Sequence, residues 1–244
     1  MINKLFSLGL LGSIMMSGVA YAHDAGDIII RNGLVSVQPM DSSNDLYIAA
    51  PELGGISNGK VSVDSDTQIG LSLTYMISSQ LGIELLAATP FSHDINGSGA
   101  LAGAGKLADT KQLPPTLSVQ YYFLEPSSAL QPYAGIGINY TNFFQESTTS
   151  TLTNSIGALA AMKGAAGVTA TSTALKLDDS IGMAAQVGVD YKMTENMGLN
   201  AAVWYADIAT SGTIIADTNV GEVRANIDVD VNPMVYMVGA YIKF

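Results

Sequence analysis

The stretch TQIGLSLTYMI, residues 67–77, places an apolar or aromatic side chain at every second position: Ile69, Leu71, Leu73, Tyr75 and Ile77. The alternate positions hold Gln68, Gly70, Ser72 and Thr74, followed by Met76 near the end. Because side chains alternate between the two faces of a β-strand, this segment has one apolar face and, as far as Thr74, one small or polar face. An apolar face toward lipid and a small or polar face toward a lumen is typical of a transmembrane β-barrel strand.

The same alternation recurs along the chain and predicts eight strands. The segments are residues 27–39, 67–77, 81–89, 113–123, 131–144, 179–191, 197–208 and from about 229 to 244. Eight is the smallest strand number of outer-membrane barrels. We therefore predict an all-β fold, an eight-stranded antiparallel transmembrane β-barrel. Strand eight would close against strand one, so that no strand edge is left unpaired in lipid.

The connections between these segments alternate in length. Residues 78–80, 124–130 and 192–196 are short links, whereas residues 40–66, 90–112, 145–178 and 209–228 are long. Short periplasmic turns and long extracellular loops are the usual arrangement in such barrels. The Ala- and Thr-rich stretch 155–175 is interrupted by Lys163 and several Gly residues, so it is not a membrane span, and we predict a loop with a short helical turn there.

Residues 1–22 have the features of a secretory signal peptide: Lys4, an apolar run and the small-x-small end Ala20-Tyr21-Ala22. Cleavage there would make His23 the first residue of a mature barrel domain, residues 23–244. An N-terminal membrane anchor is the alternative, but the apolar run is shorter than the ~20 residues of a spanning helix. We predict export to the outer membrane.

Composition narrows the class and the chemistry further. Only 13% of the residues are charged, against about 25% in soluble domains. The formal net charge of −11, without a basic patch, argues against nucleic acid as a partner. Cysteine is absent, and His23 and His93 are the only histidines, so no metal site and no cofactor is predicted. GISNG, residues 55–59, lacks the strand and helix of a nucleophile elbow, and no enzyme is predicted.

Six blocks resemble, in order and spacing, the outer-membrane protein W (OmpW) family: DIIIRNGLVSVQP, LPPTLSVQYYF, PYAGIGINYTNFF, AAQVGVDYKM, LNAAVWYADI and VNPMVYMVGAYIKF. The resemblance implies a monomeric barrel in the outer membrane of a Gram-negative bacterium. It also implies a narrow, largely apolar lumen that admits small hydrophobic compounds and releases them sideways into the bilayer. The chief departure from the family is the long insert 145–178, which leaves any function of that loop open.

The lumen is predicted from the register of each strand. In LNAAVWYADI, Asn200 cannot comfortably face lipid, so the register turns Trp204 inward, although an isolated Trp is more often an interfacial belt residue. The family resemblance also implies a lumen-facing Trp at this block. Our candidate ligand-binding residues on the lumen wall are Trp204, Tyr122, Asn200, Gln120, Gln186, Asn139 and Tyr241. The same inner face carries Glu84 and Asp190.

Two functions from different classes remain open. The first is a conduit for small hydrophobic molecules, favoured by an apolar, continuous lumen. The second is a structural or surface-interaction protein, such as a phage or bacteriocin receptor, favoured by a lumen closed by paired charges. No matched charge ladder is visible in the sequence except through Arg31 and Lys243, which favours the conduit. Pro39, Pro90 and Pro114-Pro115 lie at strand ends near the loops and could interrupt the ladder there, although Pro also simply ends strands.

The predicted partners follow from this reading. They are outer-membrane lipid and lipopolysaccharide, and small hydrophobic molecules. The outer-membrane assembly machinery is a further partner, because the last strand ends on the aromatic Phe244 in the manner of its recognition signal.

Overall fold

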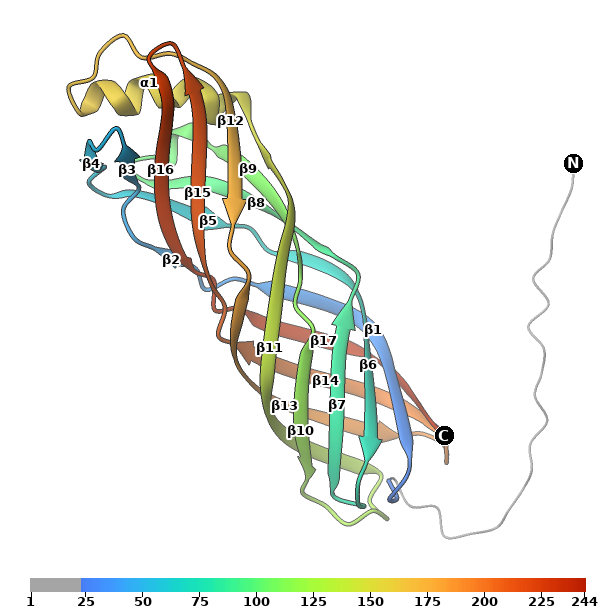
Figure 1. Ribbon diagram of the computed structural model, residues 1–244. Helices are drawn as coiled ribbons and strands as arrows, with labels where there is room; N and C mark the ends of the chain where they lie inside the picture. Colours follow the sequence, from blue (N-terminus) through green and yellow to red (C-terminus); the bar gives the residue numbers. More distant parts are fainter. Residues whose placement is uncertain (1–22) are drawn as a thin grey trace, which may run out of the picture.

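The computed structural model describes residues 23–244, which form one elongated cylinder of antiparallel strands (Figure 1). The predicted signal peptide, residues 1–22, lies outside the described residues. Within residues 23–244, no helix has the length and the apolar character that crossing a membrane requires.

Eight strands close into the predicted barrel. They are, in the order of pairing around the wall, β1 (Ile28–Gln38), β6 (Asp66–Met76), β7 (Leu81–Ala88), β10 (Thr116–Tyr122), β11 (Leu130–Thr148), β13 (Ser180–Lys192), β14 (Met197–Ala206) and β17 (Met234–Lys243). The first and last strands pair over their whole length, and at the end of this seam the amide of Phe244 donates to the Ile28 carbonyl at 2.9 Å. Closure leaves no barrel strand with an unpaired edge.

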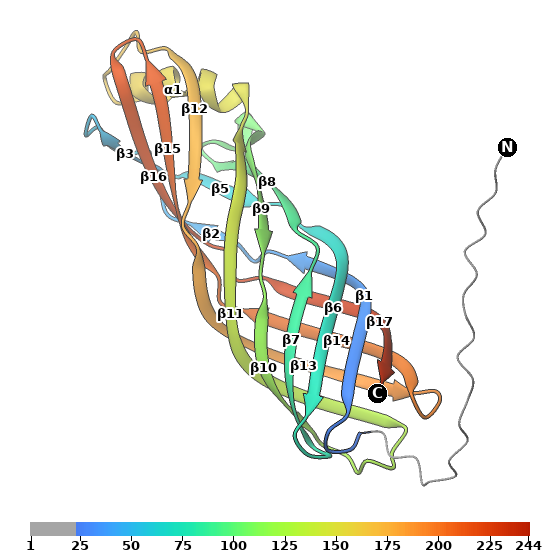
Figure 2. The same cartoon turned by 45° about the vertical axis from the view of Figure 1, so that its right-hand side comes forward.

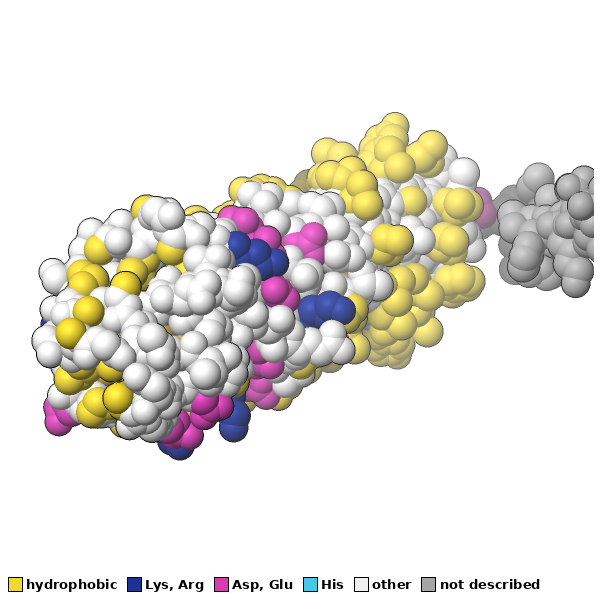
Figure 3. All heavy atoms as spheres, turned by 90° about the horizontal axis from the view of Figure 1, so that it is seen from above, with side chains coloured by type: hydrophobic (Ala, Val, Ile, Leu, Met, Phe, Trp, Pro, Cys, Tyr) yellow, Lys and Arg dark blue, Asp and Glu magenta, His cyan; other side chains and the backbone are white. Residues whose placement is uncertain are grey.

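Apolar and polar residues that alternate in the sequence point to opposite sides of the barrel wall. On β6, Ile69, Leu71, Leu73 and Tyr75 are exposed on the outside, whereas Ser72 and Thr74 are buried inside. Apolar side chains gather around this half of the molecule, and most of the charged side chains in this view lie beyond it, toward the end that carries helix α1 (Figure 3). The apolar half is the membrane-spanning part, and the half that carries α1 is the extracellular part.

The long extracellular connections are strands rather than the predicted loops. β5 (Gly59–Val63), β8 (Phe91–Gly99) and β9 (Lys106–Leu113) continue the wall beside the long β11. On the other side β12 (Ala170–Leu177), β15 (Ala209–Thr218) and β16 (Gly221–Asp230) form a second sheet together with the short strands β2 (Ser42–Ser43), β3 (Tyr47–Ala50) and β4 (Gly54–Gly55). The two sheets extend the cylinder well beyond the membrane (Figure 2).

The predicted start of the last strand, about residue 229, was wrong. Val229 belongs to β16, and the barrel strand begins only at Met234. Between them, Asn232 has a positive φ of 39°, and Pro233 has no amide hydrogen to donate to a ladder. Both features end one strand and begin another.

A helix replaces the predicted loop in the insert. α1 (Ser150–Met162) lies across the extracellular end of the cylinder, and the short 3-10 helix η1 (Ala102–Ala104) lies near it (Figure 1). The Thr149 side chain caps α1 by accepting from the Leu152 amide. Leu152, Ile156, Leu159 and Ala160 share its buried face at helical spacing, and the first three join the extracellular core. Residues 170–177 of the same stretch form β12.

Topology can be checked by proteolysis. A protease site inserted after Gly167, which is exposed and has a positive φ of 81°, should be cut on intact cells because this loop lies beyond the membrane. The same site inserted after the exposed Ser127, in the turn between β10 and β11, should be cut only after the outer membrane is breached. The reverse pattern, read by immunoblot of the fragments, would invert the assigned orientation.

Candidate functional site

A buried arginine organises the periplasmic half of the lumen. The side chain of Arg31, on β1, has no exposed surface. Its Nε and Nη2 donate to the two carboxylate oxygens of Asp190 at 3.0 and 2.6 Å. Its Nη1 donates to the Thr74 hydroxyl at 2.7 Å, and Nη2 also donates to the Tyr122 hydroxyl at 2.6 Å. Charge-assisted bonds of this two-pronged kind are strong and directional.

Amide side chains extend this network across the lumen. Gln186 donates to Glu84 at 2.8 Å, and Gln120 donates to Gln186 at 3.1 Å. Asn200 donates to Asp190 at 2.7 Å and to the Tyr133 hydroxyl at 3.0 Å. We call the set that fills the lumen here the polar floor, which comprises Arg31, Thr74, Glu84, Gln120, Tyr122, Tyr133, Gln186, Asp190 and Asn200.

The polar floor contains matched charges, and they involve Arg31, one of the two residues that the sequence left open for this role. Arg31 lies between two carboxylates, with Nη1 3.5 Å from Glu84 in addition to the Asp190 contact. Lys243 pairs instead with Asp27, at 3.0 Å and near the periplasmic rim. The charged partners of Arg31, Asp190 on β13 and Glu84 on β7, come from strands that are not neighbours of β1 in the wall, so the pattern within one strand could not reveal them.

His23 and Tyr241 lie beside the floor. The His23 ring is fully buried, packs edge-on against Tyr122 with 4.7 Å between ring centroids, and has Nε2 3.5 Å from Asp190. Its ring centroid lies 6.4 Å from that of Tyr241. With these rings in place, the periplasmic half of the lumen is filled by side chains.

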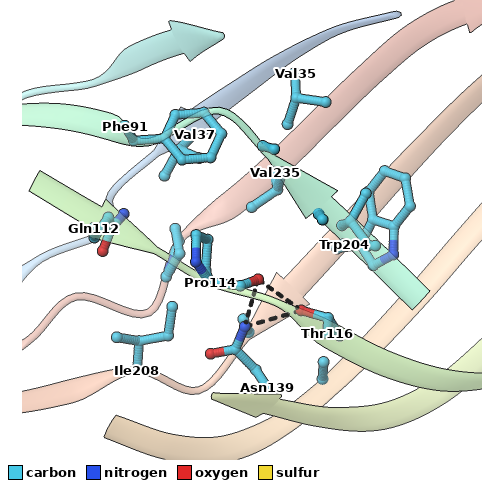
Figure 4. Close-up of a pocket in the computed structure, with 16 residues that line it drawn as sticks. Val35, Val37, Phe91, Gln112, Pro114, Thr116, Asn139, Trp204, Ile208 and Val235 are labelled. Carbon is cyan, nitrogen blue, oxygen red and sulfur yellow. Dashed lines mark hydrogen bonds between the residues drawn. The ribbon is translucent and has the colours of Figure 1, made fainter. Parts of the chain in front are cut away.

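Above the floor the lumen contains a narrow apolar cavity (Figure 4). We call it the barrel cavity. Trp204, which is only 2% exposed, forms part of its wall and is not a belt residue at the lipid interface. The other wall residues are mostly aliphatic or aromatic, and Gln112, Thr116 and Asn139 are its polar members. A cavity with an apolar wall and a few fixed polar groups suits a small hydrophobic ligand.

The wall beside this cavity is interrupted between β7 and β10. Their pairing ends at Leu86 and Thr116, and the next ladder, between β8 and β9, begins at Phe91 and Gln112. Residues 87–90 and 113–115 lie between the two ladders, and three of these seven residues are prolines, which have no amide hydrogen to bridge the gap. Ala87 is exposed on the outside of the barrel and also lines the cavity. At this interruption a single residue therefore separates the barrel cavity from the outer surface.

Asn139 fastens the inner side of the interruption. Its amide nitrogen donates to the Pro114 carbonyl oxygen at 3.2 Å and to the Thr116 hydroxyl at 2.9 Å (Figure 4). It also donates to the Pro115 carbonyl oxygen at 3.4 Å. These bonds add to the backbone pairing with β11 and hold the start of β10 where pairing with β7 is missing.

Two further small apolar cavities lie in the extracellular half. The first shares Gln112 with the barrel cavity. The second shares Val61, Ile95, Leu177 and Val229 with the first and ends at Leu152 of α1. The three cavities thus follow one another from α1 to the polar floor.

The structure separates the seven candidate ligand-binding residues into two groups. Trp204 and Asn139 line the barrel cavity, whereas Gln120, Tyr122, Gln186 and Asn200 belong to the polar floor and Tyr241 lies beside it. The sequence reading missed Val35 and Val37, although their alternation in β1 places them on the inner face. It also missed Phe91 and Gln112, because both lie in a connection that was predicted to be a loop.

Comparisons with known proteins agree with this architecture. The model of the OmpW family matches residues 24–244. Outer membrane protein W of Vibrio cholerae is 44% identical over 231 residues, which cover 94% of each chain. The crystal structure of OprG from Pseudomonas aeruginosa matches with a TM-score of 0.77 and 44% identity, over 91% of this chain and 98% of that one.

The solution structure of the E. coli outer membrane protein W matches with a TM-score of 0.52 and 34% identity, over 91% of this chain and all of that one. The family match covers the whole described barrel, and the relatives are named as outer membrane proteins. The chain therefore belongs to the OmpW family and is a β-barrel protein of the bacterial outer membrane.

Proposed function

We propose that the protein is a passive conduit through which small hydrophobic molecules cross the outer leaflet and leave sideways into the bilayer. One observation carries the proposal: the barrel cavity ends on the polar floor, and its wall includes the exposed Ala87, where the ladder between β7 and β10 is interrupted. A molecule in this cavity has lipid within reach through the wall and no open path to the periplasm. One chain closes the barrel, so a monomer is the working unit.

The linings of the three cavities favour apolar, uncharged solutes. None of their wall residues is Lys, Arg, Asp or Glu, and most are aliphatic. Apolar surface gains about 25 cal/mol per Å² on leaving water, whereas an ion without a partner is strongly disfavoured in such surroundings. An eight-stranded lumen also lacks the water-filled bore of a porin.

A surface-interaction role is the second candidate, and the polar floor favours it. Paired charges close the periplasmic half of the lumen, as expected for a barrel that conducts nothing along its axis. The ordered extracellular sheets would then be the working surface. The apolar upper half of the lumen is the feature that this alternative leaves without a role.

Uptake measurements separate the two candidates. Deleting the protein should slow the uptake of a radiolabelled alkane such as decane, while the uptake of a small hydrophilic solute should be unchanged. Equal uptake of decane with and without the protein would remove the conduit and favour the surface role.

Trp204, the only tryptophan, reports binding in the same protein. A bromine-substituted decane should quench its fluorescence saturably in purified protein, because the ring lines the barrel cavity. Bromines attached to the lipid chains should quench it weakly, because the ring is buried inside the wall. Strong quenching from lipid without a response to the free ligand would contradict the assignment of this cavity as a binding site.

A further inference from the structure

A pair of polar side chains separates the barrel cavity from the extracellular cavities. Gln112, on β9, lines the barrel cavity and its extracellular neighbour, whereas Phe91 lines only the former and His93 only the latter. His93 and Gln112 are 2% and 1% exposed, and the nearest nitrogens of the ring and the amide lie 2.8 Å apart. We call this pair the polar collar.

The hydrogen bonds of the collar fix its protonation. His93 Nδ1 lies 2.6 Å from the backbone carbonyl oxygen of Asp64, which can only accept, so Nδ1 carries a hydrogen. A neutral ring then presents Nε2 as an acceptor to the Gln112 amide. Burial lowers the pKa of His93, and the Asp64 carbonyl and the Asp66 carboxylate oppose this only in part. The neutral ring is therefore the form that satisfies both nitrogens.

His93 and Gln112 project into the lumen from the neighbouring strands β8 and β9, so a molecule that passes between the cavities passes over this pair. An alkane that pushes the two side chains apart leaves the Gln112 N–H and the His93 Nε2 without partners in apolar surroundings, which is unfavourable. A hydroxyl group accepts from the amide and donates to Nε2, so it replaces both halves of the broken bond. A carboxylate can only accept, and the lining of these cavities offers it no Lys or Arg.

We propose that the polar collar is a specificity determinant that favours uncharged amphiphiles with one hydroxyl end, such as long-chain alcohols, over alkanes and over fatty carboxylates. This inference rests on the proposed conduit, and it names the class of molecule for which the conduit is best suited. His93 and Gln112 act by exchanging their mutual hydrogen bond for bonds to the passing head group.

Matched probes of one chain length test the collar: radiolabelled decanol, decane and decanoate. Uptake is compared in cells that carry the wild type, the His93→Phe/Gln112→Leu variant or no protein, and the last value is subtracted. In the wild type, protein-dependent uptake should be fastest for decanol and absent for decanoate. The variant should lower the decanol-to-decane ratio about fivefold to tenfold, as expected for one lost hydrogen bond.

Controls keep the outcomes distinct. Gln38→Leu, at an exposed strand end outside the cavities, should leave the ratio unchanged. The single variant Gln112→Met, which keeps most of the side-chain volume, replaces the double variant if the latter loses its heat-modifiable mobility in SDS gels. If the wild type takes up neither decane nor decanol faster than cells without the protein, the conduit itself fails. Protein-dependent uptake of both with an unchanged ratio in the variant overturns only the collar.

Discussion

Replacing Arg31 by Met is expected to destabilise the barrel by about 3–5 kcal/mol, the cost of breaking a buried ion pair from one side. The substitution keeps most of the side-chain length but leaves Asp190 and Glu84 buried without their cation. It also removes the donors that satisfy Thr74 and Tyr122. The free energy of unfolding can be measured by urea titration in lipid vesicles, with Trp204 fluorescence as the signal.

Two further variants show that the charge is the cause. Arg224→Met removes an exposed arginine of the β16 strand and should cost less than about 1 kcal/mol. Adding Asp190→Asn and Glu84→Gln to Arg31→Met should recover part of the loss, because the uncompensated carboxylates are then neutral. An Arg31→Met barrel as stable as the wild type would show that water or movement relieves the buried charges.

Linking the two sides of the wall interruption should reduce uptake of decane to the level of cells without the protein. The chain has no native cysteine, so Ala87→Cys/Pro115→Cys can be bridged selectively by a cleavable bifunctional thiol reagent. The bridge would hold together the two segments at which the ladder beside the barrel cavity is interrupted, where we propose that molecules leave. Reduction of the bridge should restore uptake.

The same two strands supply a matched control. Leu85 and Leu117 are directly paired in the intact part of the β7–β10 ladder, and both face outward. A bridge between cysteines at these positions should leave uptake unchanged, because this part of the wall is already closed. Unchanged uptake with the Ala87–Pro115 bridge would mean that molecules leave the cavity by another route.

The membrane-spanning fold could be predicted because lipid and lumen demand opposite side chains on the two faces of every strand. This alternation located the eight strands to within a few residues, except for the start of β17. Parity also placed Trp204, Asn139 and the floor residues on the inner face, where the structure has them. Whether an inward residue belongs to the floor or to the cavity depends on its position along the barrel axis. The alternation of side chains predicts only the face of the strand and not this position.

The extracellular half was harder to predict because its strands face water rather than lipid. In β12, exposed and half-buried Ala, Ser and Thr residues follow one another without a clear apolar face. β16 did carry a usable signal, since Val223, Ala225, Ile227 and Val229 alternate with polar residues. The spacing of Leu152, Ile156 and Leu159 after the cap residue Thr149 likewise indicated α1. The long-range partners of Arg31 left no local pattern at all.

The seam between β1 and β17 has a consequence for how the protein assembles. It joins Ile28 to Phe244, which lie at opposite ends of the described chain. The contacts of this seam therefore span nearly the largest sequence separation that the described chain allows, and contacts of this kind form slowly. The chain loses the entropy of closing this long loop before the hydrogen bonds of the final ladder form and stabilise the barrel. Every intermediate without β17 has two open edges, and neither is tolerated in lipid. We therefore expect insertion and closure to occur as one late, slow and cooperative event.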